Sequence, residues 1–166
     1  MLNVLRRSKE RRQLAAKLHA VLVARAREPV FFERFGVSDT VDGRFDLVVL
    51  HAWLVMDRLS SAPSLLQAFV DAVFEGFDEG LRELGAGDIG MGKRVKALAD
   101  AFYGRIHAYG EAKDEAALEA ALLRNLYRGG AGPGAAILAS YVLRAKARLA
   151  ACAIEDGEVD FGPLPQ

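Results

Sequence analysis

Apolar residues recur at helical spacing along most of the chain, and this pattern most limits the folds available to it. Between Pro63 and Leu84, apolar side chains recur every three or four residues, and most charged residues fall on the opposite side. Such a stripe is typical of a helix that packs one face against a core. The stripe consists of Leu66, Phe69, Val70, Val73, Phe74, Phe77, Leu81 and Leu84. Because no segment shows the strict alternation of a half-buried strand, the sequence predicts an all-α fold.

Proline and glycine divide the chain into segments that carry this helical pattern. A chain of 166 residues with 52% hydrophobic residues is long and apolar enough to form one core. The segments expected to be helical are residues 8–27, 42–59, 63–84, 93–112, 114–126 and 134–154, and a short aromatic turn lies at 30–35. The sequence therefore predicts one compact all-α bundle of six or seven helices over residues 13–154. Residues 155–166 are expected to form an irregular tail.

The first twelve residues form a basic amphipathic segment. Met1, Leu2, Val4 and Leu5 precede five basic residues, an order opposite to that of a secretory signal. Such a segment can contact a membrane surface peripherally, or it can be the solvated start of the first helix. The longest apolar run, residues 47–56, is much shorter than the roughly 18 residues of a membrane span.

Composition and charge argue against several functional classes. The chain has 22 basic and 22 acidic residues, and this zero formal net charge argues against binding of nucleic acid through broad positive charge. Cys152 is the single cysteine, so neither an intramolecular disulfide nor a zinc site built from several cysteines can form. His19, His51 and His107 lie on different predicted helices, without the spacing of metal ligands. We therefore expect no metal, no cofactor and no enzymatic activity.

A glycine-rich loop over residues 85–92 resembles two nucleotide-binding motifs. It contains G-x-G-x-x-G, and with Lys93 it is nearly a Walker A sequence. Arg94, however, stands where that motif needs a hydroxyl side chain, and a helix rather than a strand precedes the loop. The segment is best interpreted as a linker between helices. Anion binding without catalysis at the start of the next helix is the alternative.

Two polar stripes lie on helices that are otherwise largely apolar. Arg44, His51 and Arg58 are seven residues apart, so they share one side of their helix. This arrangement is typical of an amphipathic groove that holds an apolar segment of a partner. The second stripe consists of Lys93, Lys96, Asp100, Tyr103 and His107, opposite the apolar side of the helix over residues 93–112. An ordinary solvated face is the alternative interpretation of both stripes.

Two further segments have a recognisable order of residues. In the first, Gly36-Val37-Ser38-Asp39-Thr40 leads into a helix that contains Leu50-His51 and Trp53. The second runs from Asp88 to Lys96 and is followed by Phe102-Tyr103-Gly104-Arg105 and Tyr109. Both resemble blocks of the ubiquinol–cytochrome c chaperone family, and the resemblance covers about residues 29–126. Neither block is a catalytic motif.

The resemblance implies a non-enzymatic assembly chaperone. By analogy with the family, the protein is expected to bind newly made cytochrome b, or segments of it, during biogenesis of ubiquinol–cytochrome c reductase. The ribosome and a small partner protein are further expected partners. The expected location is the bacterial cytoplasm, at the inner face of the membrane, or the mitochondrial matrix if the source is a eukaryote.

The resemblance also favours partner binding over the other interpretations of the two stripes. The expected partner-binding residues are Asp39, Thr40, Arg44, His51, Arg58, Lys93, Lys96, Tyr103 and His107. Asp39 and Thr40 have an alternative role as turn or cap residues before the helix over residues 42–59. The competing hypothesis for the whole chain is a helical protein that binds a small ligand, a lipid or a quinone in a cavity lined by that helix.

Overall fold

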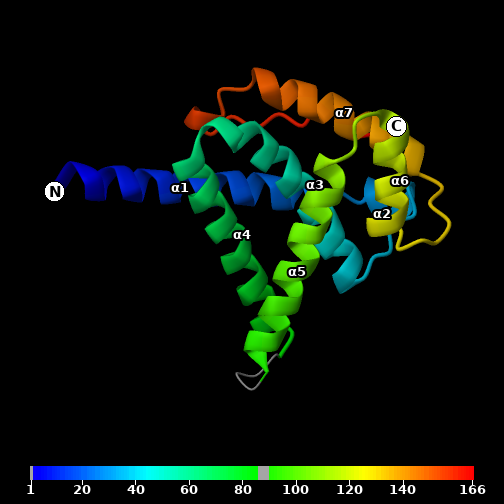
Figure 1. The fold of residues 1–166 in the computed structure, drawn as a ribbon, viewed down its shortest axis with the longest axis horizontal. Coiled ribbons are helices and arrows are strands. Elements are labelled where there is room, and N and C mark those ends of the chain that lie inside the picture. The colour runs from blue at the N-terminus through cyan, green and yellow to red at the C-terminus, as the bar shows by residue number, and fades with distance from the viewer. Residues whose placement is uncertain (1, 86–89) are drawn as a thin grey trace.

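A computed structural model describes residues 2–85 and 90–166, and it shows a bundle of helices around one core (Figure 1). The helices are α1 (Leu2–Ala26), α2 (Val30–Glu33), α3 (Val41–Arg58), α4 (Pro63–Glu83), α5 (Met91–Gly110), α6 (Glu115–Asn125) and α7 (Ala135–Ala151). Two 3-10 turns, η1 (Leu59–Ser61) and η2 (Ile154–Asp156), follow α3 and α7. The described residues contain no strand, so the prediction of an all-α bundle is confirmed.

The central element is α3, which packs against α1, α5 and α7. It begins at Thr40, whose Oγ1 accepts a hydrogen bond from the backbone N–H of Gly43 at 3.1 Å. This cap satisfies one of the free N–H groups at the helix start. A Cβ atom on Gly43 would lie 1.9 Å from the carbonyl oxygen of Ser38. The loop before α3 can therefore approach the helix only because position 43 has no side chain.

Helices α1 and α4 form another close packing in the bundle. At their contact, a Cβ atom on Gly76 would lie 2.5 Å from Cε1 of His19, so a glycine lets the imidazole pack against α4. Burial lowers the pKa of His19. Helix α1 begins at Leu2 rather than near residue 8, where the sequence predicted its start. The added turns carry helix-favouring arginines and an Arg6–Glu10 ion pair at 2.9 Å.

The residues after α7 are irregular beyond η2, but they pack on the body. Phe161 is 2% exposed, and its ring lies 5.3 Å from the ring of His51. Arg25 Nη2 donates a hydrogen bond to the carbonyl oxygen of Gly162 at 2.6 Å, and Arg148 Nε donates to Asp160 Oδ2 at 2.9 Å. The tail is therefore part of the core around α3, not a solvated extension.

Candidate functional site

Helices α4 and α5 together form a helical hairpin whose far end projects from the rest of the molecule (Figure 1). Near the body, aromatic rings fill the space between the helices. Phe102 lies 5.2 Å from Phe74 and 6.1 Å from Phe77, measured between ring centroids. Towards the far end, neighbouring residues cover the apolar side chains less completely, and Leu84 is 62% exposed. Four further apolar residues at this end are partly exposed: Leu81, Met91, Val95 and Leu98.

The polar stripe on α5 lies on the surface. Lys93, Lys96, Tyr103 and His107 are all exposed, and Asp100 between them is exposed as well. Tyr103 is 52% exposed, and its ring stacks on Phe74 with centroids 6.1 Å apart. Neither Lys93 nor Lys96 forms an ion pair with another residue in the described ranges. The sequence correctly placed these side chains together on one open face, and their binding of a partner stays a prediction.

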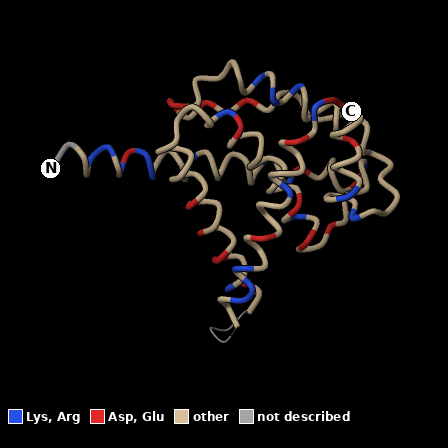
Figure 2. Tube along the Cα trace, in the orientation of Figure 1, with Lys and Arg blue, Asp and Glu red and all other residues tan. Residues whose placement is uncertain are grey.

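Charges follow the same hairpin in an ordered way. Figure 2 shows acidic residues along α4 and basic residues where α5 begins. Asp71, Glu75 and Glu79 are exposed on α4, while Lys93 and Arg94 are exposed on α5. The hairpin therefore combines incompletely covered apolar side chains at its end with charges of both signs on its sides.

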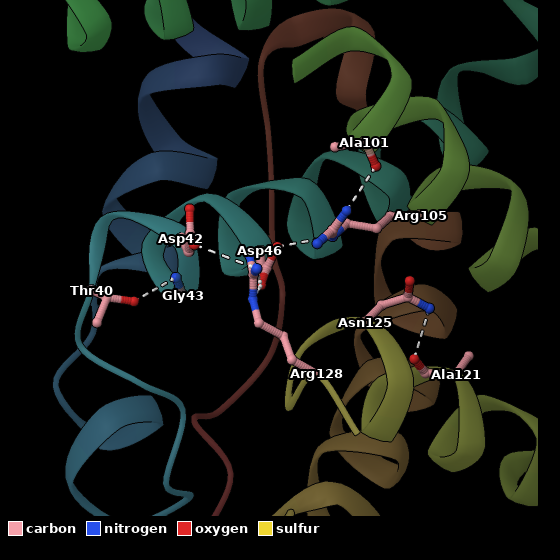
Figure 3. Close-up of polar contacts among 9 residues, drawn as sticks. All are labelled: Thr40, Asp42, Gly43, Asp46, Ala101, Arg105, Ala121, Asn125 and Arg128. Atoms are coloured by element: carbon pink, nitrogen blue, oxygen red, sulfur yellow. Dashed lines mark hydrogen bonds and ion pairs between the residues drawn. The ribbon is translucent and has the colours of Figure 1, made fainter. Parts of the chain in front are cut away.

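A buried ion-pair network joins α5 to α3. Asp46 is 0% exposed, and its Oδ1 lies 2.8 Å from Arg105 Nε, while its Oδ2 lies 3.1 Å from Arg128 Nη2. Arg128 also approaches Asp42 Oδ2 at 3.4 Å, and Arg105 Nη1 donates to the carbonyl oxygen of Ala101 (Figure 3). Burial raises the pKa of Asp46, and the two arginines oppose that rise.

This network was not predicted from the sequence. A carboxylate at position 46, inside the apolar stretch around Leu47, could have indicated a buried ion pair, because an unpaired buried charge is costly. The identity of its partners depends on tertiary structure, since Arg105 and Arg128 are distant in sequence. Nearby, the hydroxyl of Tyr109 is buried and has no hydrogen-bond partner among the described residues. Burial is also the main cause of its raised pKa.

The loop before α3 places two of the predicted site residues in exposed positions. Asp39 Oδ1 accepts a hydrogen bond from Arg44 Nε at 2.7 Å, and this contact lowers the pKa of Asp39. Both side chains are more than half exposed. An open pocket of about 340 Å³ lies beside them, lined by Arg27, Pro29, Phe32, Glu33, Asp39 and Arg44. Thr40 acts as the cap of α3, which is the alternative role that the sequence allowed.

His51 does not lie on an open groove, and this corrects the expectation from its spacing with Arg44 and Arg58. It is 0% exposed, because α7 and the tail cover this side of α3. Its Nδ1 donates to the carbonyl oxygen of Leu47 at 2.8 Å, which leaves Nε2 to accept from the hydroxyl of Tyr141 at 3.0 Å. Burial lowers the pKa of His51 to about 4, so the imidazole is neutral at neutral pH.

Arg58 is also engaged within the protein. Its Nε donates to the carbonyl oxygen of Leu149 at 3.2 Å, and its Nη2 donates to that of Cys152 at 3.0 Å. Leu149 lies in the last turn of α7 and Cys152 caps its end, where a cation offsets the negative end of the helix dipole. Because Arg44, His51 and Arg58 lie in three different surroundings, the predicted groove on this side of α3 is not formed.

The remaining sequence predictions concern the glycine-rich loop, metal binding and a ligand cavity. The glycine-rich loop joins α4 to α5, so it follows a helix, and its residues 86–89 lie outside the described residues. Gly90, with φ of 88°, directly precedes α5. No group of three or more candidate metal ligands occurs in residues 2–85 and 90–166. A second open pocket, of about 390 Å³, lies between α1 and the tail. Arg44, at the start of α3, lines the first pocket, and no residue of α3 lines the second, so a ligand cavity along α3 stays a prediction.

No helix in the described ranges is both long enough and apolar enough to cross a membrane.

Comparison with known proteins gives three concordant matches. The profile of the family described as "Ubiquinol-cytochrome C chaperone" matches residues 33–157. The ubiquinol-cytochrome-c reductase complex assembly factor 1 of Xenopus laevis is 25% identical over 118 residues, which are 68% of this chain and 59% of that protein. The chain thus spans about three fifths of the length of this relative.

A crystal structure of the Cbp3 homolog from Brucella abortus has the same fold. It superposes with a TM-score of 0.84 at 36% sequence identity, and the match covers 98% of this chain and 97% of that one. The family profile alone covers well over half of the sequence. The chain therefore belongs to the ubiquinol–cytochrome c chaperone family.

Proposed function

We propose that the protein is a non-enzymatic assembly chaperone of ubiquinol–cytochrome c reductase and that it binds newly made cytochrome b through the α4–α5 hairpin. Membership of the chaperone family supports the general role. The name of the Xenopus laevis relative, an assembly factor of the reductase complex, supports the same process. The hairpin itself supports the proposed binding surface.

The observation that carries this proposal is the exposed stripe of α5 beside the incompletely covered end of the hairpin. Lys93 and Lys96 lie close in sequence to Met91 and Val95, which are partly exposed, and Leu84 is mostly exposed. Apolar segments of a membrane protein aggregate before they are inserted, and a surface of this kind can cover them temporarily. The lysines and His107 would orient the bound segment by pairing with its acidic or carbonyl groups.

The loop before α3 is a second proposed contact. The Asp39–Arg44 pair is exposed and opens at little cost, because solvent screens an ion pair at the surface. Arg44 can therefore exchange Asp39 for an acidic group of a partner, and the adjacent pocket can hold a small side chain. Proposed further partners are the ribosome and a small partner protein, at the cytoplasmic face of the membrane.

Site-specific photocrosslinking tests the surface. A photoreactive residue replaces Tyr103, which is 52% exposed on α5, and in a matched control it replaces Leu143, which is 38% exposed on α7. We expect crosslinks to cytochrome b from position 103 and few or none from position 143. Equal crosslinking from both positions, or none from position 103 while position 143 reacts, would place the binding surface elsewhere.

Charge reversal tests the consequence for assembly. A strain that lacks the native gene receives Arg44→Glu with Lys96→Glu, or the control pair Arg124→Glu with Arg144→Glu, which are also exposed. We expect loss of assembled reductase with the first pair only, because only this pair lies on the proposed surface. All four side chains lie outside the core, so both variants should still fold. Thermal unfolding of each purified variant checks that the fold is retained. Normal assembly with a folded Arg44→Glu, Lys96→Glu variant would refute the proposed surface.

A further inference from the structure

The start of α1 is a helical arm that extends away from the bundle. Helix α1 is continuous from Leu2 to Ala26, and among its side chains described from residue 4 onward the first buried one is Ala15. Figure 1 shows the first turns of the helix beyond the other elements. Residues 4–13, here called the α1 arm, are exposed or partly exposed along their whole length. Packing of the core therefore does not explain which side chains the arm carries.

The charge of the molecule is divided between this arm and the remainder of the chain. Five of the 22 basic residues and one of the 22 acidic residues lie in the first twelve positions. This segment therefore has a formal charge of +4, and residues 13–166 have a formal charge of −4. Figure 2 shows the basic residues on the arm, with a single acidic position among them. The zero net charge of the whole protein conceals this separation.

The arm also exposes large apolar side chains close to the cations. Val4 is 68% exposed and Leu5 is 67% exposed, more than any other large hydrophobic side chain whose exposure the structure describes, in residues 4–85 and 90–166. Arg7 and Arg11 are four residues apart and follow each other on one side of the helix. Long arginine side chains can place their charges at a polar surface while nearby apolar groups enter a less polar layer.

We infer that the α1 arm binds the surface of an anionic membrane, with Arg7 and Arg11 near lipid headgroups and Val4 and Leu5 in the boundary layer. Basic residues and exposed apolar side chains on one helix are features of helices that bind at a membrane interface. RNA also attracts cations, but exposed aliphatic side chains gain little from phosphates. The arm also has no aromatic residue to stack on bases. An anionic membrane surface attracts the cations and also accepts the aliphatic side chains. It would repel the remainder of the protein, which is acidic.

Flotation of the whole protein with lipid vesicles tests this inference. Vesicles of phosphatidylcholine with 30 mol% phosphatidylglycerol are compared with vesicles of phosphatidylcholine alone. We expect binding only to the anionic vesicles, and we expect it to weaken strongly in 0.5 M NaCl. Each cation at an anionic surface strengthens binding by about five-fold, so Arg7→Gln with Arg11→Gln should weaken binding by roughly 25-fold.

Two controls distinguish vesicle binding through the arm from general electrostatic attraction. Arg124→Gln with Arg144→Gln removes the same charge from exposed positions on α6 and α7 and should leave vesicle binding unchanged. Val4→Ser with Leu5→Ser should weaken vesicle binding while all charges remain. Thermal unfolding should be the same for all variants, because none of these side chains is buried.

Three outcomes would overturn the inference. These are absence of binding to anionic vesicles, equal losses from the arm and the α6–α7 variants, and tight binding of an RNA oligonucleotide that Val4→Ser with Leu5→Ser leaves unchanged. Vesicle binding is measured without cytochrome b. If the arm does not bind lipid, the proposed role of the hairpin is therefore unaffected. If the hairpin does not bind cytochrome b, lipid binding by the arm can still be measured.

Discussion

The burial of His51 predicts a specific pH dependence of stability. An unfolded histidine has a pKa near 6.5, whereas burial lowers the pKa of His51 to about 4 in the folded protein. Between these values the unfolded chain binds a proton that the folded protein excludes. The free energy of unfolding therefore falls as the pH decreases from about 6.5 to about 4, and the contribution of His51 levels off below that range.

The size of this change in unfolding free energy follows from the shift in the pKa of His51. A change from 6.5 to about 4 corresponds to about 3 kcal/mol in total, of which about 2 kcal/mol falls between pH 7 and pH 5. Urea unfolding at both pH values measures it, and the single tryptophan, Trp53, gives a fluorescence signal because it is only 6% exposed. His51→Phe retains an aromatic ring of similar size and removes the titrating group.

The comparison between variants isolates His51 from other groups. Contributions from the other titratable groups, such as the partly buried His19, are common to both proteins and cancel in the difference. We expect the wild type to lose about 2 kcal/mol more than His51→Phe between pH 7 and pH 5. An equal loss of unfolding free energy in His51→Phe would show that position 51 is accessible to water. That result would favour the open groove predicted on this side of α3.

Two further predictions concern packing and the buried ion pairs. Gly43→Ala should lower the free energy of unfolding by about 1–3 kcal/mol, because the new Cβ would lie 1.9 Å from a carbonyl oxygen. At Gly80 no atom outside the neighbouring helix backbone lies within 4 Å of a new Cβ, so Gly80→Ala should raise the free energy of unfolding by up to about 1 kcal/mol. Urea unfolding of both variants measures the difference, and two stabilised variants would refute the close contact at position 43. A double-mutant cycle with Asp46→Asn and Arg105→Gln should give a coupling of about 1–3 kcal/mol, because these side chains are 0% and 15% exposed. An exposed pair would give less than about 1 kcal/mol, and a value that small would refute the buried pairing.

The helices could be predicted because their apolar residues recur with the helical period and because proline and glycine separate them. The same argument located the exposed stripe of α5. Lys93 and His107 lie opposite the residues that pack against α3, and a helix at the edge of a bundle must expose the side opposite its core face. For α5, knowledge of the inner face was sufficient to infer the outer one.

This argument fails for α3, because a central helix has no free side. Spacing of seven residues shows that Arg44, His51 and Arg58 share one side, but not what covers that side. The three residues extend over about 21 Å of helix axis, and the neighbours change over this length. Arg44 is at the solvated start, His51 lies under α7 and the tail, and Arg58 binds the last carbonyl groups of α7. Contacts between distant segments, not local pattern, determine the role of each residue.

The arrangement of charges connects the fold with the two proposed surfaces. Asp46 and Arg105 join α5 to the core at one end, so the exposed stripe is carried by a helix whose base is held in place. The α1 arm and the hairpin leave the body at different places (Figure 1), and they share no residue. Contact of the arm with lipid would therefore leave the hairpin free for a protein segment. A chaperone held at the membrane through the arm would meet apolar segments where they are inserted, at a higher local concentration than free diffusion allows.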